Sequence, residues 1–227
     1  MPQRSASRTR ARTPSSRSTP PPPPISPRQA QLFEAPAAPK RPNDFNLVVA
    51  VSGDPASGKS SVCEPLARLY GIKRVYSGGI FRDMAKVFDM ELLEFTTFVA
   101  EHPELDRVIE SRQVALAKRG NVLLEGRMAG WAVDQASVPG LRLFLAARPE
   151  VQIQRIMHRE GVDAERAAVL TRERQEELHQ KYIRLYGYDF FDLRHYDAVI
   201  DTSDLDPQEV FERACAEVDR FIRGDRV

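Results

Sequence analysis

Cysteine and long apolar segments are both scarce in this chain of 227 residues. The two cysteines, Cys63 and Cys215, have no metal-ligand spacing, and two thiols exclude a disulfide-rich scaffold. We expect both to be small apolar side chains in a reducing compartment. No apolar run approaches the ~18–20 residues that cross a bilayer, and the N-terminus lacks the apolar core of a secretory signal. The sequence therefore predicts a cytoplasmic protein without a membrane segment.

Net charge is also low, at +1, because a basic segment and an acidic one nearly cancel. Residues 1–44 carry eight basic and two acidic groups and include five consecutive prolines, Pro20–Pro24. Such a segment buries too little apolar surface to offset its ordering entropy, so we expect a disordered tail. Three alternatives stay open for it: weak contact with nucleic acid, an organelle transit peptide, or docking of the prolines on a partner. We expect the protein to be a monomer.

Residues 45–227 have the length of one ordinary domain, and short apolar runs alternate in them with longer helical patterns. The runs of strand length lack polar alternation, as in a parallel sheet covered on both faces: Leu47–Ser52, Arg74–Ser77, Val122–Leu124, Leu141–Ala146 and Ala198–Asp201. Helices are expected near 59–70, 79–118 in two or three pieces, 129–136, 149–158, 163–186 and 207–222. This alternation predicts an α/β fold with a parallel sheet.

A phosphate-binding loop is the strongest motif. The segment from Gly53 to Ser60 matches G-x-x-x-x-G-K-[ST] and stands between the first strand and the first helix: Gly53, Asp54, Pro55, Ala56, Ser57, Gly58, Lys59 and Ser60, with Ser61 next. Glycines let several backbone N–H groups face one anion, and the helix N-terminus adds its dipole. Lys59 can reach the β- and γ-phosphates and the Ser60 hydroxyl can bind Mg²⁺. The motif predicts a nucleoside-triphosphate site.

Polar residues that follow two other strands are candidates for an acceptor site, because ligands of open α/β sheets bind at the carboxyl ends of the strands. Ser77 and Arg82 follow the second strand, and a guanidinium there can bind a second phosphate through two hydrogen bonds. Glu125, Gly126 and Arg127 follow the third strand. We expect Glu125 to hold Mg²⁺ and Arg127 to hold the acceptor phosphate.

Cations on the later helices can neutralise a transferring phosphoryl group. Arg155 and Arg159 are spaced i,i+4 on one helix face, and Arg174 lies beyond the break at residues 160–163. We expect these three arginines to act with Lys59 and Arg127 in catalysis, on a segment that closes over the site. A solvated helix face with Glu/Arg pairs is the alternative interpretation.

The residues quoted above, with several further segments, resemble the cytidylate kinase family, and its short archaeal type more than its long bacterial type. The resemblance covers roughly residues 46–222. Its more specific parts are Gly126-Arg127-Met128-Ala129-Gly130-Trp131, Tyr186-Gly187-Tyr188-Asp189, and Ser77-Gly78-Gly79-Ile80-Phe81-Arg82. The resemblance implies a P-loop nucleoside monophosphate kinase fold, with a five-stranded parallel sheet flanked by helices, a lid (about 155–182) and a helical monophosphate-binding insertion (about 78–118).

The resemblance also implies an activity: Mg²⁺-assisted transfer of the γ-phosphoryl group from ATP to CMP or dCMP. Matched positions would hold ATP phosphates at Gly53–Ser60 and the acceptor phosphate at Arg82 and Arg127. The insertion would read the base, and its polar candidates include Asp106 and Arg112. Alternatives are a kinase for another nucleoside monophosphate or small anion, and a non-catalytic nucleotide switch or nucleic-acid-associated protein that uses the tail.

Overall fold

The computed structural model describes residues 46–225, and within this range it leaves out the side chains of eight residues in three helices. These are Leu92, Leu93, Thr96, Ala100, Pro103, Leu170, Glu173 and Arg174. The predicted tail at 1–44 lies outside the described residues, so the boundary near residue 44 stays a prediction.

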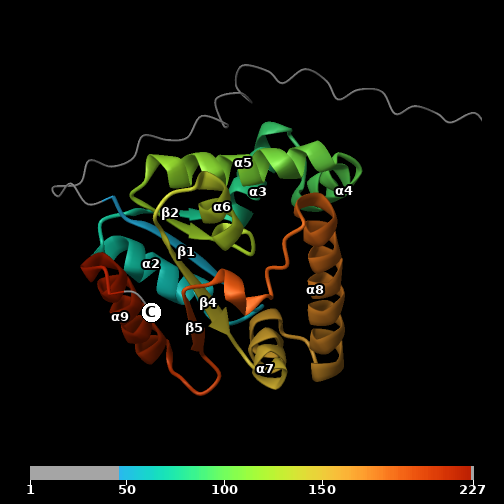
Figure 1. Cartoon of the computed structure of the whole chain (residues 1–227). Coiled ribbons are helices and arrows are strands. Elements are labelled where there is room, and N and C mark those ends of the chain that lie inside the picture. The colour runs from blue at the N-terminus through green and yellow to red at the C-terminus, as the bar shows by residue number, and fades with distance from the viewer. Residues whose placement is uncertain (1–45, 226–227) are drawn as a thin grey trace, which may run out of the picture.

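A five-stranded parallel sheet forms the centre of the molecule, in the order β2-β3-β1-β4-β5 (Figure 1). Its strands are β1 (Val48–Gly53), β2 (Lys73–Tyr76), β3 (Val122–Glu125), β4 (Leu141–Ala146) and β5 (Ala198–Asp201). The three central strands are almost wholly buried, which explains why their sequences are continuous apolar runs. The fold class predicted from the sequence is confirmed.

Two apolar layers cover the two faces of the sheet (Figure 1). On one face, α2 (Lys59–Leu69) and α9 (Pro207–Arg223) pack together and against the sheet, with Leu66 and Val218 buried. On the other face lie α3 (Ser77–Val87), α5 (Pro103–Arg119) and α6 (Ala129–Ala136). The short α4 (Leu92–Glu101) joins this second layer through the fully buried Phe95.

The predicted helical stretch at 79–118 is three helices, α3, α4 and α5, and these follow directly from β2. Beyond β4, α7 (Pro149–Glu160) and α8 (Ala164–Tyr186) form the predicted pair with a break between them. Gly161 ends α7 in the left-handed region (φ 67°), and the Asp163 carboxylate accepts a hydrogen bond from the first turn of α8. Figure 1 shows α8 at one edge of the molecule, where its Lys181 pairs with Asp106 of α5.

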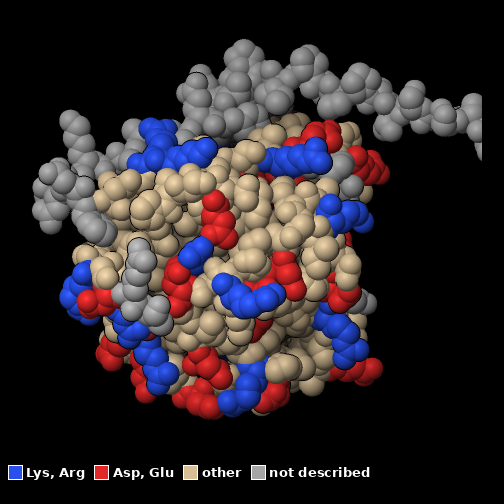
Figure 2. Space-filling view, in the orientation of Figure 1, with Lys and Arg blue, Asp and Glu red and all other residues tan. Residues whose placement is uncertain are grey.

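Charges of both signs alternate over the face shown in Figure 2, with no large area of one sign among the described residues. No described helix combines the length and the apolar character that a membrane crossing needs. The surface on this face therefore gives no sign of a strongly basic nucleic-acid site.

Candidate active site

The phosphate-binding loop joins β1 to α2 in a tight turn. At Gly53 (φ 148°) an added Cβ would lie 2.3 Å from the Leu145 carbonyl oxygen, so the close approach of β4 requires glycine there. Gly58 (φ 86°) caps α2 in the left-handed region. The Asp54 carboxylate accepts a hydrogen bond from the Ala147 N–H (3.0 Å), which ties the loop to the end of β4. The loop thus presents the N-terminus of α2 to an anion.

Lys59 folds back over this loop. Its Nζ donates to the carbonyl oxygens of Gly53 (2.9 Å) and Asp54 (2.5 Å). Burial, followed by the positive charge of Arg127, lowers the pKa of Lys59 to about 8. In the structure the Lys59 ammonium group is stabilised by carbonyl dipoles. Bound phosphates would give it an anionic partner and so favour its charged form.

A buried carboxylate lies next to the loop. Glu125, at the end of β3, is 1% exposed, and its Oε1 accepts a hydrogen bond from the Ser60 hydroxyl (2.7 Å). Its Oε2 accepts a hydrogen bond from Arg74 Nε of β2 (2.8 Å) and forms an ion pair with Nη2 of the same side chain (2.6 Å). Hydroxyl and carboxylate oxygens are the hard donors that suit Mg²⁺. No group of three or more His, Cys, Asp or Glu among the described residues could hold a metal alone, so Mg²⁺ here would also need phosphate oxygens.

A cleft of about 830 Å³ opens over these groups at the carboxyl ends of the strands. Most of the residues predicted for the site line it: Pro55, Ala56, Ser57, Gly58, Lys59, Ser60, Ser61, Ser77, Glu125, Gly126, Arg127, Arg155 and Arg159. Gly53, Asp54, Arg82, Asp106 and Arg112 do not line it, although Gly53 and Asp54 belong to the phosphate loop. The cleft thus brings together the first strand, the third strand and α7, as the sequence predicts.

The acceptor candidates on α3 follow Tyr76, the last residue of β2. Arg82 is exposed, and its guanidinium carbon lies 5.6 Å from the centre of the Tyr76 ring, which itself lines the cleft. Ser77 faces Gly126 so closely that a Cβ on Gly126 would lie 2.4 Å from the Ser77 hydroxyl oxygen. Glycine at 126 therefore lets the Ser77 side chain of α3 pack directly against the loop after β3.

Polar side chains of α5 and α8 form a second, buried cluster. Gln113 is fully buried and donates from Nε2 to Glu110 Oε2 (2.5 Å), while Asp106 forms an ion pair with Lys181 of α8. Burial, and then the nearby Asp106 charge, raises the pKa of Glu110 to about 8. Within the described residues, Gln113 Oε1 and the Tyr186 hydroxyl are buried in this cluster without a hydrogen-bond partner. Arg112 Nε is also buried without one, but the charge near Arg112 is Asp83 of α3. The cluster therefore has an unused donor and an unused acceptor.

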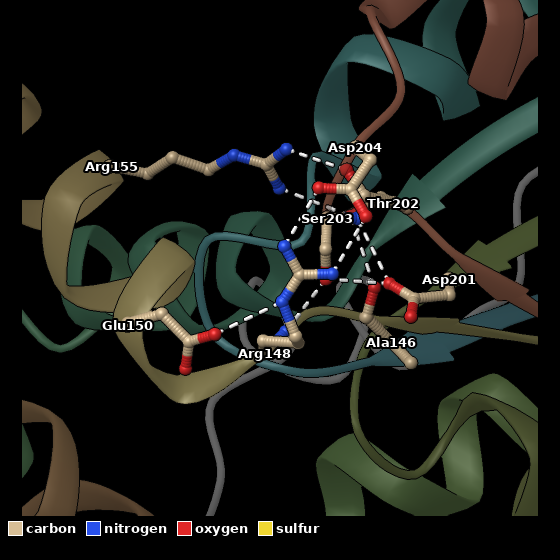
Figure 3. Close-up of polar contacts among 8 residues, drawn as sticks. All are labelled: Ala146, Arg148, Glu150, Arg155, Asp201, Thr202, Ser203 and Asp204. Carbon is tan, nitrogen blue, oxygen red and sulfur yellow. Dashed lines mark hydrogen bonds and ion pairs between the residues drawn. The ribbon is translucent and has the colours of Figure 1, made fainter.

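Arg155 of α7 crosses to the loop that follows β5, as Figure 3 shows. Its guanidinium donates to the carbonyl oxygen of Thr202 (2.7 Å), to the Thr202 hydroxyl (3.0 Å) and to the carbonyl oxygen of Ala56 in the phosphate loop (3.1 Å). Thr202 in turn bonds to Ala146 of β4 through both its N–H and its hydroxyl. Arg155 thus joins α7 to both loops.

A second arginine supports the same loop from the other side (Figure 3). Arg148 donates through both terminal nitrogens to the Asp204 carboxylate (2.7 Å each), and its N–H donates to the Ser203 hydroxyl (2.9 Å). Asp201 accepts from the Ser203 N–H and hydroxyl. The loop after β5 is therefore held in a single conformation beside the phosphate loop.

The other two predicted catalytic arginines differ in what the structure describes. Arg159 is exposed at the cleft and pairs with Glu160 (2.8 Å). Arg174 belongs to α8, but its side chain lies outside the described part of the structure, so its role stays a prediction.

Sequence reasoning missed three residues that organise the site: Arg74, Tyr76 and Thr202. The strand pattern at 74–77 suggested structural roles for the first two. Parallel register places Tyr76 directly beside Glu125, which only the strand order reveals. Thr202 follows the last strand, and the rule that ligands lie at the carboxyl ends of strands would have identified its position.

Comparison with protein families and relatives gives a consistent result. The model of the "Cytidylate kinase-like family" matches residues 48–204. A protein from Pyrococcus abyssi named cytidylate kinase is 44% identical over 175 residues, covering 77% of this chain and 95% of that protein. A protein of the same name from Methanocaldococcus jannaschii is 37% identical over 176 residues, covering 77% of this chain and 99% of that one.

Solved structures support the fold. An uncharacterized protein from Eubacterium ventriosum superposes with a TM-score of 0.58 at 18% identity, covering 76% of this chain and 98% of that one. Shikimate kinase from Bacteroides thetaiotaomicron superposes with a TM-score of 0.52 at 14% identity, covering 78% of this chain and 96% of that one. At these identities the likeness concerns the arrangement of strands and helices alone.

Proposed function

The chain belongs to the cytidylate kinase-like family, and we propose that it transfers the γ-phosphoryl group of ATP to CMP or dCMP. The observation that carries the proposal is the single cleft in which the phosphate loop, Glu125 and Arg127 meet. Transfer between two phosphate groups needs positioning and charge neutralisation more than covalent chemistry. A cleft with cations on opposite walls is suited to that task.

ATP is proposed to bind with its phosphates along Gly53–Ser61. Lys59 would leave the carbonyl oxygens that it contacts and bind the β- and γ-phosphates. When bound, Mg²⁺ would neutralise phosphate charge, and the Ser60 hydroxyl and Glu125 are proposed to hold it. Arg155, which joins the phosphate loop to the loop after β5, is proposed to fix the donor side of the cleft.

The acceptor phosphate is proposed to bind at Arg127, near Ser77 and Gly126, with Arg82 entering from behind Tyr76. Arginine suits this position because its planar fork can bind two phosphate oxygens at once. The attacking atom is already an anionic phosphate oxygen, so no general base is required. Lys59 and Arg127 would then stabilise the charge on the group in transit.

The base is proposed to lie between α5 and α8. Cytosine offers an amino donor at N4 and acceptors at N3 and O2. The buried cluster supplies matching groups: Gln113 Oε1 as an acceptor and the Tyr186 hydroxyl as a donor. Asp106 and Lys181, which now pair with each other, border the same space. Opening of this interface would admit the base and satisfy atoms that have no hydrogen-bond partner among the described residues.

We further propose that the insertion spans about residues 78–118 and the lid about residues 155–182. Gly161 and the break before Asp163 allow α8 to move relative to α7. Movement of α8 would bring Arg174 toward the phosphates, beside Arg159 of α7, which already lines the cleft, and would exclude water from them.

The test is release of ADP from ATP and Mg²⁺, with CMP, dCMP, UMP, AMP, GMP and shikimate supplied in turn. CMP or dCMP should give the highest kcat/KM. Arg127→Ala and Lys59→Ala should each lower kcat about 100-fold or more. Arg68→Ala, on the exposed surface of α2, is the control and should leave kcat unchanged.

Two outcomes would refute the proposal. Turnover of the Lys59 and Arg127 variants within a few fold of wild type would exclude the assigned chemistry. Higher kcat/KM with shikimate or a purine monophosphate would keep the phosphoryl transfer but exclude the assigned acceptor.

A further inference from the structure

Arg74 reaches the buried carboxylate of Glu125 from a neighbouring strand. In the parallel register of β2 and β3, Arg74 lies beside Leu123, and Glu125 lies two residues farther along β3 on the same face. This diagonal spacing is within reach of a long side chain. Arg74 also donates from Nη1 to Glu64 of α2 (2.9 Å), so its guanidinium is held at both ends.

The two oxygens of Glu125 have different partners. Oε2 accepts a charge-assisted hydrogen bond from Arg74 Nε and forms an ion pair with Nη2 of the same guanidinium, whereas Oε1 accepts a hydrogen bond from the neutral Ser60 hydroxyl. Because the Glu125 side chain is 1% exposed and that of Arg74 is 24% exposed, water screens the pair weakly. Rotating Oε2 away from Arg74 would leave a buried guanidinium and carboxylate unpaired, which is costly. Only Oε1 is therefore oriented toward the phosphate loop.

Metal ions differ in how many oxygens of such a carboxylate they coordinate. Mg²⁺ keeps a strict octahedral shell and commonly takes one carboxylate oxygen, directly or through water. Ca²⁺ is larger, accepts six to eight oxygens and often binds both oxygens of one carboxylate. A glutamate with one oxygen occupied can serve the first ion well and the second poorly.

We propose that Arg74 is a positioning residue that restricts Glu125 to one oxygen at the metal site and so favours Mg²⁺ over larger divalent cations. The inference rests on the proposed function, since the ion is shared with the ATP phosphates. Charge alone does not account for the arrangement. A lysine would supply the charge but lacks the planar fork that places Nε and Nη2 against Oε2 while Nη1 reaches Glu64.

The experiment compares ATP binding with saturating Mg²⁺ and with saturating Ca²⁺, where all the ATP in solution is chelated in both cases. Calorimetry gives the Kd of each complex, and the ratio of the Ca²⁺ value to the Mg²⁺ value measures metal selection without turnover. The variants are Arg74→Gln, which removes the charge, and Arg74→Lys, which keeps it. The matched controls are Arg68→Gln and Arg68→Lys, since Arg68 also pairs with Glu64 but does not contact Glu125 in the structure.

Wild type and both Arg68 variants should prefer Mg²⁺ by the same ratio. In Arg74→Gln the ratio should fall about 10-fold or more, the usual effect of removing a residue that orients a metal ligand. In Arg74→Lys it should fall by an intermediate factor. If Arg74→Gln fails to fold because Glu125 is left unpaired, the ratio measured for Arg74→Lys alone tests the proposal.

A ratio within twofold of wild type in Arg74→Lys and in any folded Arg74→Gln would overturn the proposal. Failure of the proposed function has a different signature: ATP binding that does not respond to either metal in wild type, or no transfer to any nucleoside monophosphate.

Discussion

The buried Glu110 provides a stability prediction that does not depend on catalysis. Its carboxyl is fully buried beside Asp106, which shares its sign, and Gln113 and Lys181 are the groups that favour its charged form. The balance favours the protonated acid, with a pKa of about 8 against 4.5 in the unfolded chain. Replacing Glu110 by Gln keeps the shape and the hydrogen-bond acceptor for Gln113 but removes the titration.

The sign follows from proton binding. Between the two pKa values the folded protein holds a proton at Glu110 that the unfolded chain has released, so raising the pH lowers the free energy of unfolding. The limiting slope is about 1.4 kcal/mol per pH unit. From about pH 5 to pH 7.5, Glu110 should therefore remove about 3 kcal/mol, a large part of the ~5–15 kcal/mol that stabilises a domain.

The assay is urea unfolding of wild type and Glu110→Gln at about pH 5, 6, 7 and 7.5, with the free energy of unfolding extrapolated at each. The difference between the two proteins isolates Glu110, because the other titrating groups are common to both. The free energy of unfolding of Glu110→Gln should rise steadily relative to that of wild type as the pH rises. Glu104→Gln, on the exposed side of the same helix, is the control and should run parallel to wild type.

The reasoning would be refuted if the difference in free energy of unfolding between Glu110→Gln and wild type stayed constant within about 0.5 kcal/mol at every pH. A constant difference would mean that water or a movement of α8 solvates the carboxylate when it ionises.

Three further predictions concern other parts of the chain. Because the pKa of Lys59 is about 8, ATP binding at about pH 8 should take up protons, seen by calorimetry in buffers of different ionisation enthalpy; Lys59→Arg should abolish the uptake. Gly53→Ala places a Cβ 2.3 Å from the Leu145 carbonyl oxygen and should cost about 1–3 kcal/mol of stability, with weaker ATP binding. Phe95→Ala empties a fully buried site between three other phenylalanines and should cost about 3–5 kcal/mol in urea unfolding; a loss below 1 kcal/mol would contradict the packing.

Most of the fold follows from local patterns in the sequence. The buried runs at β1 and β4 predicted their strands within a residue, and Gly161 and Asp163 marked the break between α7 and α8. Local patterns do not contain the strand order, because the order depends on which apolar faces pack together across the whole chain. The division of the stretch at 79–118 into α3, α4 and α5 was likewise only partly predictable, since its apolar residues are spread along all three helices.

The candidate site was predictable where one segment carries the chemistry. The phosphate loop is continuous in sequence, and Glu125 and Arg127 follow a strand directly, so elementary rules found them. Arg74 was not predictable, because its importance depends on a contact 51 residues away that exists only when β2 pairs with β3. The α5–α8 cluster was found in part: Asp106 was predicted, but its pairing with Lys181 of α8 depends on a contact between distant segments that local patterns do not contain.

Strand β2 links the two halves of the cleft. Arg74 orients the carboxylate proposed to hold the metal, while Tyr76, two residues later, has the guanidinium carbons of both Arg74 and Arg82 within 6 Å of its ring centre. A guanidinium near an aromatic ring is attracted to the ring's negative face, so Tyr76 favours positions of both arginines near it. The proposed metal side and the proposed acceptor side of the cleft therefore both depend on β2. Because β2 is paired with β3 along its whole length, the sheet holds both proposed sides at a fixed spacing, as transfer between two phosphates requires.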